Sequence, residues 1–435
     1  MGIMNLKHFF FVLCFFFCTS LFAQQYDIHV VRKGETLNSI SKIYDVLPNF
    51  VLKKNPDIFL KVREGDVLVI PRMDTLLNNL NERRQRNIAL FLPFYLDQND
   101  TIEYYKEFDD KEVIYKKSTP AVDFYLGYKF AVDSLQKMGM YFNTFVFDTA
   151  NDSTQIQENI DVELLDTMDL VIGPLYPQPF GLLLDTLIKN RIKIPVVMPF
   201  SSKNTLVDSC EMLFKVEPDL KLEALHTMEI IKKYFLKYPK IVMIDTSDVY
   251  HQNLISLLDK DSILYHISDT IGGYAKISYL FDQNFNDSDT NIVIAFSRKR
   301  SFLTDVITQL NALRDSSVFL VSNSTLAGST NIESRYFNNL NFHYSMPQHI
   351  SYNDSTVIRF FNKFLNDFKT EPNKHSIRGF DIAYYFLSNI NKIENLPFFE
   401  GISMGFEFLP TKSESFINKY FYLLKYKDFA IEELR

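Results

Sequence analysis

From residue 87 onward, short apolar runs alternate with segments of helical periodicity, and this alternation limits the fold more than any other feature. The run 87–94 is apolar almost throughout, as strands buried on both faces are, and 121–138 carries apolar side chains at helical spacing. Such alternation predicts right-handed β-α-β units on a parallel sheet. The predicted strands are 87–94, 142–147, 170–172, 194–198, 240–245, 262–266, 291–295 and 318–321, and the predicted helices are 121–138, 180–189, 220–236, 250–258 and 302–313.

The alternation occurs in two similar halves, which predicts an α/β fold with two parallel-sheet lobes and a cleft between them. The parts of the sequence that carry a family resemblance are Ile88 to Pro93, Val171-Ile172-Gly173-Pro174, Ile194 to Ser202, Phe360 to Asp367 and Arg378 to Ala383. In this order they resemble type I periplasmic binding proteins of the Leu/Ile/Val-binding kind, over residues 87–435. The resemblance implies three crossings that act as a hinge, with lobe one at about 87–215 and 343–400 and lobe two at about 216–342 and 401–435.

The loops after the third and fourth strands hold the ligand in amino-acid-binding members of this family, through hydroxyls and backbone amides. Here the second loop offers Ser201 and Ser202, whereas Pro177 stands near the position of the first expected hydroxyl and has neither hydroxyl nor N–H. The candidates for contacts in the cleft are Tyr176, Ser201, Ser202, Asp248 and Tyr250. Tyr250 is equally well explained as a cap of the helix that is expected to begin there.

The loop Gly173-Pro174-Leu175 resembles peptidoglycan-synthase activator lipoproteins instead. Those proteins have a domain of this fold and use it as a protein-interaction platform. This resemblance therefore implies a wall-synthesis protein as a partner, while the hydroxyls of the fourth-strand loop favour a small ligand.

Residues 24–72 form a separate unit with its own order of elements. A strand is predicted at 26–31, a helix that Thr36 caps follows, a second short helix ends at Asn55-Pro56, and 67–70 closes the unit as a strand. The residues that match the lysin motif (LysM) family in order and spacing are Val31, Gly34, Glu35, Thr36, Leu37, Ile40, Tyr44, Leu52, Asn55, Pro56, Gly65, Asp66, Leu68, Ile70 and Pro71. The segment is thus similar to a LysM module.

A LysM module implies binding of N-acetylglucosamine-containing glycan, above all peptidoglycan, in a groove between two loops. The residues of the two matching loops are Gly34, Glu35, Thr36, Leu37, Asn55, Pro56, Asp57 and Ile58. Because the chain has no Trp, an indole stacking platform is excluded and one module is expected to bind weakly, with avidity from several copies or a second site. The alternative, that these positions only build the fold, applies best to Leu37.

The first 23 residues are expected to be a secretory signal. Lys7 and His8 precede an apolar run, and Ala23 is a small residue at the exit. An uncleaved membrane anchor is the alternative, although the apolar run is shorter than the ~20 apolar residues that span a membrane. Lipidation at Cys18 is disfavoured, because the sequence before this cysteine lacks the usual small residues. Loss of this segment leaves Cys210 alone, so no internal disulfide is possible. We therefore expect an exported protein of the periplasm or cell envelope, with no transmembrane segment in the mature chain.

A polar connector at 73–86 ends in Arg83, Arg84 and Arg86, which either belong to a solvated linker or touch anionic wall polymer.

The net charge of −7 argues against nucleic-acid binding. No catalytic His spacing, nucleophile elbow or phosphate loop is present, and the segment 282–287 lacks the glycine and the terminal glutamate of a calcium loop. We therefore expect no enzyme activity, no cofactor and no metal.

Two functions remain open from the sequence. In the first, the LysM module tethers the protein to peptidoglycan glycan strands and the bilobal domain is a regulator or interaction platform for wall synthesis. In the second, the protein is a solute receptor for an amino acid or muropeptide, in transport or sensing. A third function, wall hydrolysis, has no residues to carry it.

Overall fold

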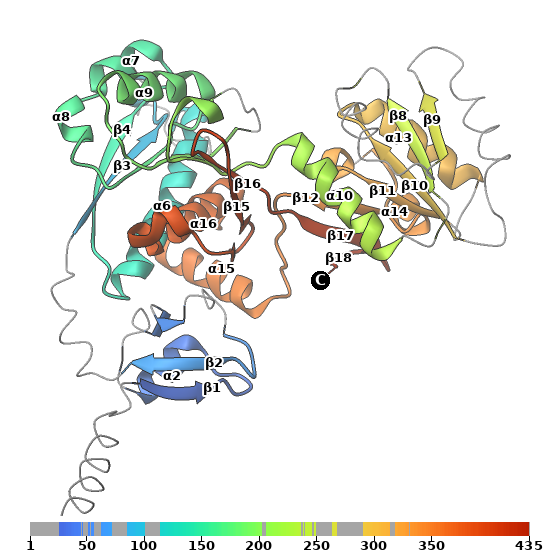
Figure 1. The fold of residues 1–435 in the computed structure, drawn as a ribbon, viewed down its shortest axis with the longest axis horizontal. Coiled ribbons are helices and arrows are strands. Elements are labelled where there is room, and N and C mark those ends of the chain that lie inside the picture. Colours follow the sequence, from blue (N-terminus) through green and yellow to red (C-terminus); the bar gives the residue numbers. More distant parts are fainter. Residues whose placement is uncertain are drawn as a thin grey trace, which may run out of the picture.

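The computed structural model describes residues 26–44, 46, 51–52, 54–55, 62–71, 85–100, 114–201, 206–235, 238, 240–245, 248, 263–267, 290–313, 318–329 and 331–434. The expected signal, the helix expected at 250–258 and the segment 282–287 lie outside these residues. Figure 1 shows a small N-terminal module and two larger lobes that lie side by side.

Lobe one is built on a seven-stranded sheet in the order β15-β16-β7-β6-β5-β3-β4, parallel except for the edge strand β15. The strands are β3 (Arg86–Leu92), β4 (Phe142–Asp148), β5 (Leu170–Ile172), β6 (Val196–Met198), β7 (Leu213–Lys215), β15 (Phe408–Pro410) and β16 (Phe416–Asn418). The last five residues of β3 are buried, because helices cover both faces of the sheet. The expected connector ends one residue earlier than predicted: Arg86 begins β3 and pairs with Asp169 at 2.8 Å, so it belongs to the lobe.

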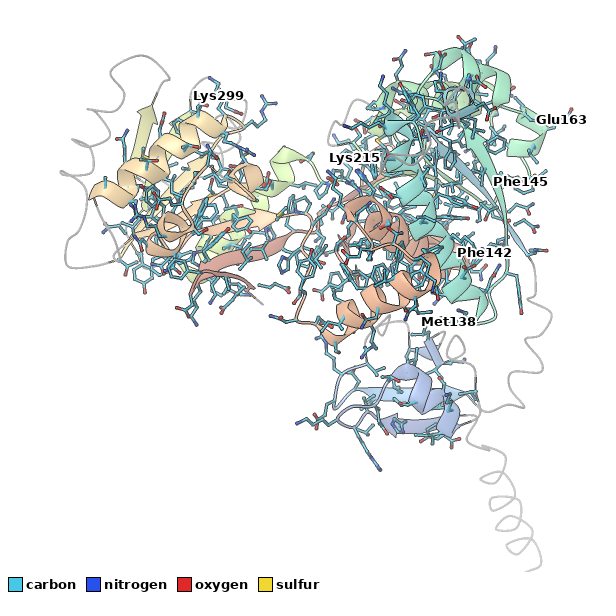
Figure 2. All side chains as sticks on the ribbon, turned by 180° about the vertical axis from the view of Figure 1, so that it is seen from behind. Met138, Phe142, Phe145, Glu163, Lys215 and Lys299 are labelled. Atoms are coloured by element: carbon cyan, nitrogen blue, oxygen red, sulfur yellow. The ribbon has the colours of Figure 1, made fainter. Side chains whose placement is uncertain are left out.

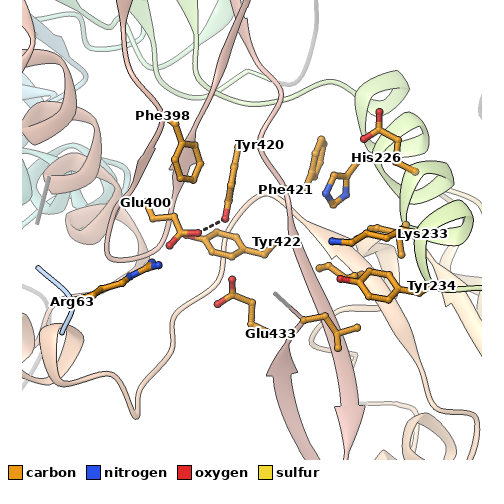
Figure 3. A pocket seen from close by; sticks show the side chains of 14 residues that line it. Arg63, His226, Lys233, Tyr234, Phe398, Glu400, Tyr420, Phe421, Tyr422 and Glu433 are labelled. Atoms are coloured by element: carbon orange, nitrogen blue, oxygen red, sulfur yellow. Dashed lines mark hydrogen bonds between the residues drawn. The ribbon is translucent and has the colours of Figure 1, made fainter. Parts of the chain in front are cut away.

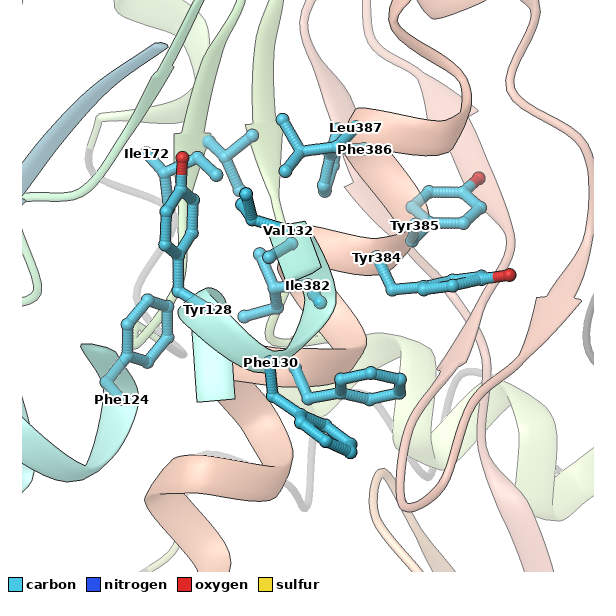
Figure 4. Close-up of a cluster of buried hydrophobic side chains, with 14 of the residues drawn as sticks. Phe124, Tyr128, Phe130, Val132, Ile172, Ile382, Tyr384, Tyr385, Phe386 and Leu387 are labelled. Carbon is cyan, nitrogen blue, oxygen red and sulfur yellow. The ribbon is translucent and has the colours of Figure 1, made fainter. Parts of the chain in front are cut away.

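Helices cover this sheet on both sides, and each side has its own core. The helices of lobe one are α5 (Leu96–Asp100), α6 (Thr119–Gln136), α7 (Ser153–Asn159), α8 (Val162–Leu165), α9 (Pro177–Lys189), α15 (Ser355–Phe368) and α16 (Lys374–Ser388). Ile88 and Leu90 face a core made by α6, α15 and α16, part of which Figure 4 shows. Ala89 and Phe91 face the opposite core with α9, as the alternation of strand side chains requires.

Two glycines set the distance between α6 and α16. A Cβ on Gly127 would lie 1.8 Å from the carbonyl oxygen of Ser376, and one on Gly379 would lie 2.2 Å from that of Phe124. No side chain fits at such distances, so the helices approach backbone to backbone. Aromatic rings such as Phe130 and Tyr384 fill the space beside this contact (Figure 4).

Lobe two has a second seven-stranded sheet, in the order β18-β17-β12-β11-β10-β8-β9. Its strands are β8 (Lys240–Asp245), β9 (Ile263–Ile267), β10 (Asn291–Phe296), β11 (Val318–Ser322), β12 (His343–Met346), β17 (Tyr422–Lys427) and β18 (Ala430–Glu433), and its helices are α10 (Leu220–Tyr234), α13 (Arg300–Leu313) and α14 (Ser334–Asn339). The first five strands are parallel, and β17 and β18 are antiparallel additions. Helices α13 and α14 pack on one face and α10 on the other. The prediction of two parallel-sheet lobes is confirmed.

The lobe boundaries differ from those expected at the C-terminal side. Strand β12 at 343–346 pairs with β11 and belongs to lobe two, whereas 405–418 stays in lobe one because β16 pairs with β7. The chain therefore crosses between the lobes near 216–219, 347–354 and 419–421. These strands are too short for their sequence to indicate which of the two sheets they join.

The small module consists of β1 (Tyr26–Val30) and β2 (Val67–Pro71), paired antiparallel, with α2 (Leu37–Ile43) between them. Its core contains Val31, Ile40, Val46, Val51, Leu68 and Ile70. The strands and the first helix begin and end within a residue or so of the prediction, and of the expected second helix the structure describes Val51, Leu52 and Lys54 in helical conformation.

Candidate functional site

The loop 34–37 of the small module is fixed by hydrogen bonds to its own chain. Gly34 has φ +85°, a value that favours glycine. Thr36 caps α2 through a reciprocal pair: its Oγ1 accepts from the Ser39 N–H at 3.1 Å, and the Thr36 N–H donates to the Ser39 Oγ at 2.8 Å. Leu37 packs partly against the core. Gly34 is exposed, so the loop presents its backbone on a rigid support.

Glu35 lies in this loop and contacts His29, a residue that the sequence did not single out. Glu35 accepts from the Arg32 N–H at 2.8 Å and pairs with His29 Nε2 at 2.8 Å, while His29 Nδ1 contacts the Tyr44 hydroxyl at 3.1 Å. The Arg32 backbone bond and the His29 contact lower the pKa of Glu35. The carboxylate is thus ionised and holds the turn after β1.

The second expected glycan loop begins at Asn55, which is buried. Its side-chain amide donates to the Val51 and Val69 carbonyls at 2.7 and 2.8 Å, and its Oδ1 accepts from the Val69 N–H at 2.8 Å. Asn55 therefore clips the loop to β2. Pro56, Asp57 and Ile58 lie outside the described residues.

In lobe one, the loop after β5 leaves the sheet through a cis Gly173-Pro174 peptide. A Cβ on Gly173, whose φ is +88°, would lie 2.3 Å from the Phe91 carbonyl oxygen, so glycine is required. Pro177 begins α9 directly after this loop, a position where a missing N–H costs least. Tyr176, the residue before the helix, makes no side-chain capping bond and is partly exposed.

Tyr176 lies near aromatic residues at the carboxyl edge of the lobe-one sheet that were not predicted from the sequence. The rings of Tyr95 and Tyr115 lie 5.4 Å apart, and those of Phe94 and Tyr125 lie 5.9 Å apart. Burial, followed by the nearby Tyr176, raises the pKa of Tyr95. All five rings are partly exposed, and partly exposed tyrosines are typical of protein interfaces. In the sequence, Phe94 and Tyr95, just after β3, are the residues that could have indicated this surface.

The loop after β6 is held by Arg378 of α16. The Arg378 guanidinium donates to the Pro199 carbonyl and to Glu217 Oε2, both at 2.6 Å, and lies 4.3 Å from the ring centroid of Phe200. Because Glu217 stands in the first crossing, the arginine ties this loop to the hinge. Ser201 is 8% exposed, and Ser202 lies outside the described residues.

In lobe two, Asp248 is 3% exposed and contacts Arg298 of the same lobe. Its Oδ2 accepts from the Arg298 N–H at 2.7 Å, and its Oδ1 lies 3.3 Å from the Arg298 Nε. Ser297 Oγ donates to the neighbouring Asp245 at 2.8 Å. Asp248 is therefore a structural residue of the β8 and β10 ends, and Tyr250 lies outside the described residues.

The second crossing is anchored through Asp381 of α16, which is fully buried. Its carboxylate accepts from the N–H groups of Ile402, Ser403 and Met404 at 2.7, 2.8 and 3.0 Å, and so shapes the turn between β13 (Phe399–Glu400) and β14 (Gly405–Phe406). Burial raises the pKa of Asp381 to about 6, against the lowering effect of these hydrogen bonds. The Ser403 carbonyl in turn accepts from the His349 N–H at 2.9 Å, which ties the second crossing to lobe one.

The buried Lys215 closes lobe one at the first crossing. Figure 2 shows Lys215 on the side of lobe one that faces lobe two, and Lys299 on lobe two. Its ammonium donates to the Glu217 carbonyl, and burial lowers its pKa to about 8. This interaction fixes the chain direction as it leaves β7.

Across the described part of the chain, no group of His, Cys, Asp or Glu side chains is arranged to hold a metal ion. No helix in the same part is long and apolar enough to cross a membrane. The pKa of the Cys210 thiol is raised by burial, which opposes nucleophilic reactivity.

Comparison with known proteins gives structural matches only. No protein-family model matches the chain, and no curated protein matches it. The structure is similar to a putative branched-chain amino acid ABC transporter from Rhodospirillum rubrum, with 8% identity, a TM-score of 0.58 and coverage of 80% of this chain and 100% of that one.

The structure is also similar to LpoA (YraM) from Haemophilus influenzae. Its C-domain, described as a regulator of PBP1A, matches with 15% identity and a TM-score of 0.50 over 80% of this chain and 100% of that one. Full-length LpoA matches with 14% identity and a TM-score of 0.52 over 82% of this chain, which spans 61% of LpoA. At these identities the likeness concerns the fold alone, and the two lobes have the type I periplasmic binding protein fold.

Proposed function

We propose that this chain is an exported, non-enzymatic protein of the cell envelope that is tethered to peptidoglycan and serves as an interaction platform for a wall-synthesis protein. In this proposal the small module is a LysM domain that binds the glycan, and the bilobal domain contacts the partner. The observation that favours the platform over a solute receptor is the state of Asp248. The carboxylate that a receptor would offer to a ligand is buried and paired with Arg298.

Three features of the small module support the tether. The order of β1, α2 and β2 agrees with the expected motif, the loop 34–37 is rigid with an exposed backbone at Gly34, and Asn55 fixes the start of the second loop. Backbone N–H and C=O groups on fixed loops suit the acetamido group of the sugar, because such groups lose little freedom on binding.

The lobe-one edge supports a protein partner. Pro174 and Pro177 have no backbone N–H, so this loop has fewer amide donors to hold a carboxylate. Tyr95, Tyr115 and Tyr176 offer an amphipathic, partly exposed surface. The fold is shared with the LpoA C-domain, a regulator of PBP1A. A PBP1A-like protein is therefore the partner we propose.

Two measurements on the mature chain test this function. Sedimentation with purified peptidoglycan should pellet the intact chain and leave a variant lacking residues 26–71 in solution, provided circular dichroism shows that the variant is folded. Pull-down should retain a PBP1A-like protein, and Tyr95→Ala together with Tyr115→Ala should weaken this capture without altering sedimentation. Equal pelleting of the deletion variant would refute the tether, and unaffected capture would refute the tyrosine surface.

A solute receptor is the second candidate, because the putative branched-chain amino acid transporter protein gives a TM-score of 0.58. A thermal-shift screen of the mature chain against amino acids and muropeptides tests it, since a ligand that binds only the folded state raises the Tm. A saturable shift that Tyr176→Ala abolishes would favour the receptor over the platform.

A further inference from the structure

A pocket of about 480 Å³ lies at the hinge, apart from the loops at the carboxyl ends of the strands. Lobe one contributes β13, the third crossing contributes Tyr420, lobe two contributes α10, β17 and β18, and the small module contributes Arg63. Figure 3 shows these side chains pointing into one space. A molecule that fills this pocket touches both lobes, so its binding is coupled to their relative orientation.

Aromatic rings form the apolar wall of the pocket. The ring of Tyr420 lies 5.4 Å from that of Phe398 and 5.0 Å from that of Tyr422. Phe398 is 52% exposed, which is high for a ring in such a cluster. On the lobe-two side, His226 stacks on Phe421 at 5.4 Å. The wall suits the aliphatic part of a small organic molecule.

The charged groups that line the same space are Arg63, Glu229, Lys233, Glu400 and Glu433. Two of them, Lys233 and Glu400, retain hydrogen-bonding capacity. Glu400 Oε1 accepts from the Tyr420 hydroxyl at 2.8 Å, and no described residue donates to its second oxygen. The Lys233 ammonium lies 4.9 Å from the ring centroid of Tyr234 and donates to no acceptor among the described residues. In Figure 3 Lys233 and Glu400 enter from opposite sides, with the tyrosines between them.

We propose that this hinge pocket binds a zwitterionic amino acid or short peptide. The ligand's carboxylate pairs with Lys233, its ammonium pairs with Glu400, and its aliphatic part lies on Tyr420 and Phe398. Each ionic group of the ligand meets one of opposite sign that would otherwise be hydrated, and charge-assisted hydrogen bonds of this kind are the strong ones. Since Lys233 belongs to lobe two and Glu400 to lobe one, the ligand fixes the opening of the hinge.

Calorimetric titration of the mature full-length chain tests the proposal. The probes are free lysine, meso-diaminopimelic acid and D-alanyl-D-alanine, so that the free amino acids and the wall-type dipeptide are distinguished. We expect saturable binding of at least one probe. For D-alanyl-D-alanine, which has one ammonium and one carboxylate, the N-acetylated form lacks the ammonium and the C-terminal amide lacks the carboxylate. For lysine and diaminopimelic acid the matching controls are the forms with every amino group acetylated and with every carboxyl group amidated. Each control should bind at least tenfold more weakly than its parent probe. Absence of binding by every probe at millimolar concentration would overturn the proposal.

Variants locate the binding. Lys233→Gln and Glu400→Gln should each weaken binding at least tenfold, whereas Lys232→Gln, one position earlier on α10 and outside the pocket, should bind as the parent chain does. Equal binding by all three variants would refute the site. Small-angle scattering should show a ligand-dependent change in radius of gyration that Glu400→Gln abolishes, and a change that persists in this variant counts against the hinge pocket.

The small module reaches this pocket through Arg63, but the variants that test the pocket separate its ligand from the glycan tether. Lys233→Gln and Glu400→Gln should sediment with peptidoglycan as the parent chain does, because neither lies in the 26–71 module. Failure of the titration alone therefore removes the pocket and leaves the proposed function, and failure of sedimentation alone does the reverse.

Discussion

Acid should weaken lobe two through His343, which begins β12. The imidazole is 5% exposed, lies 5.3 Å from the ring of Phe235 and 5.6 Å from that of Phe319, and contacts the Asn341 carbonyl through Nδ1. Burial lowers its pKa from 6.5 to about 4, and Lys425 across the strand pair adds to the lowering. The folded lobe thus holds this histidine neutral.

The magnitude follows from the difference in proton affinity. The unfolded chain takes up the proton near pH 6.5 and the folded chain only near pH 4, so the unfolded state binds more protons between these values. Stability from this residue is fully present above pH 6.5 and is lost as the pH falls through 4. At about 1.4 kcal/mol for each pKa unit, the loss is about 3 kcal/mol, a large part of a typical domain's stability.

Urea denaturation followed by circular dichroism between pH 7 and pH 4 measures this loss. In His343→Phe the free energy of unfolding should fall by about 3 kcal/mol less over this range than in the parent chain. Phe235→Leu is the matched control, because it changes the packing around the same imidazole without removing a titrating group. The reasoning is refuted if His343→Phe keeps the parent's pH dependence, or if Phe235→Leu changes that dependence to the same extent.

Three further substitutions test the packing. Gly379→Ala should destabilise lobe one by about 2 kcal/mol or more in urea denaturation, because its Cβ would collide with a carbonyl of α6. The control is Gly181→Ala, whose Cβ would lie 3.8 Å from its nearest neighbour and which should be neutral or stabilising. Asp381→Ala leaves three backbone amides without their acceptor and should cost about 3–5 kcal/mol by the same measurement; a cost below about 1 kcal/mol would contradict its anchoring function. Asn55→Ala should reduce hydrogen-exchange protection of β2, because it removes the side-chain hydrogen bonds to Val69. Unchanged protection would show that these bonds are dispensable.

Periodicity was sufficient to predict the individual elements, but not the assignment of short strands to a sheet. Strands β3 and β10 are long apolar runs, and their positions follow from local sequence. Strand β16 has three residues, and its sheet is set by pairing with β7, about two hundred residues earlier in the chain. Such pairing depends on tertiary contacts, which is why the C-terminal lobe boundaries were wrong.

The candidate sites show the same dependence on distance along the chain. The cap at Thr36 could be predicted because its partner Ser39 is three residues away. Arg378 and Glu217 are separated by 161 residues, and no local pattern indicates that they pair. Asp248 looked available in the sequence because its partner Arg298 reaches it only in the folded lobe.

The most direct test of the central claim measures how much of a PBP1A-like protein the mature chain retains on purified peptidoglycan. The tethered-platform account predicts that the intact chain increases the retained amount, and that the variant lacking residues 26–71 binds the partner in solution but retains none of it on the wall. Equal retention by the intact chain and this variant, or no retention by either, would contradict the account.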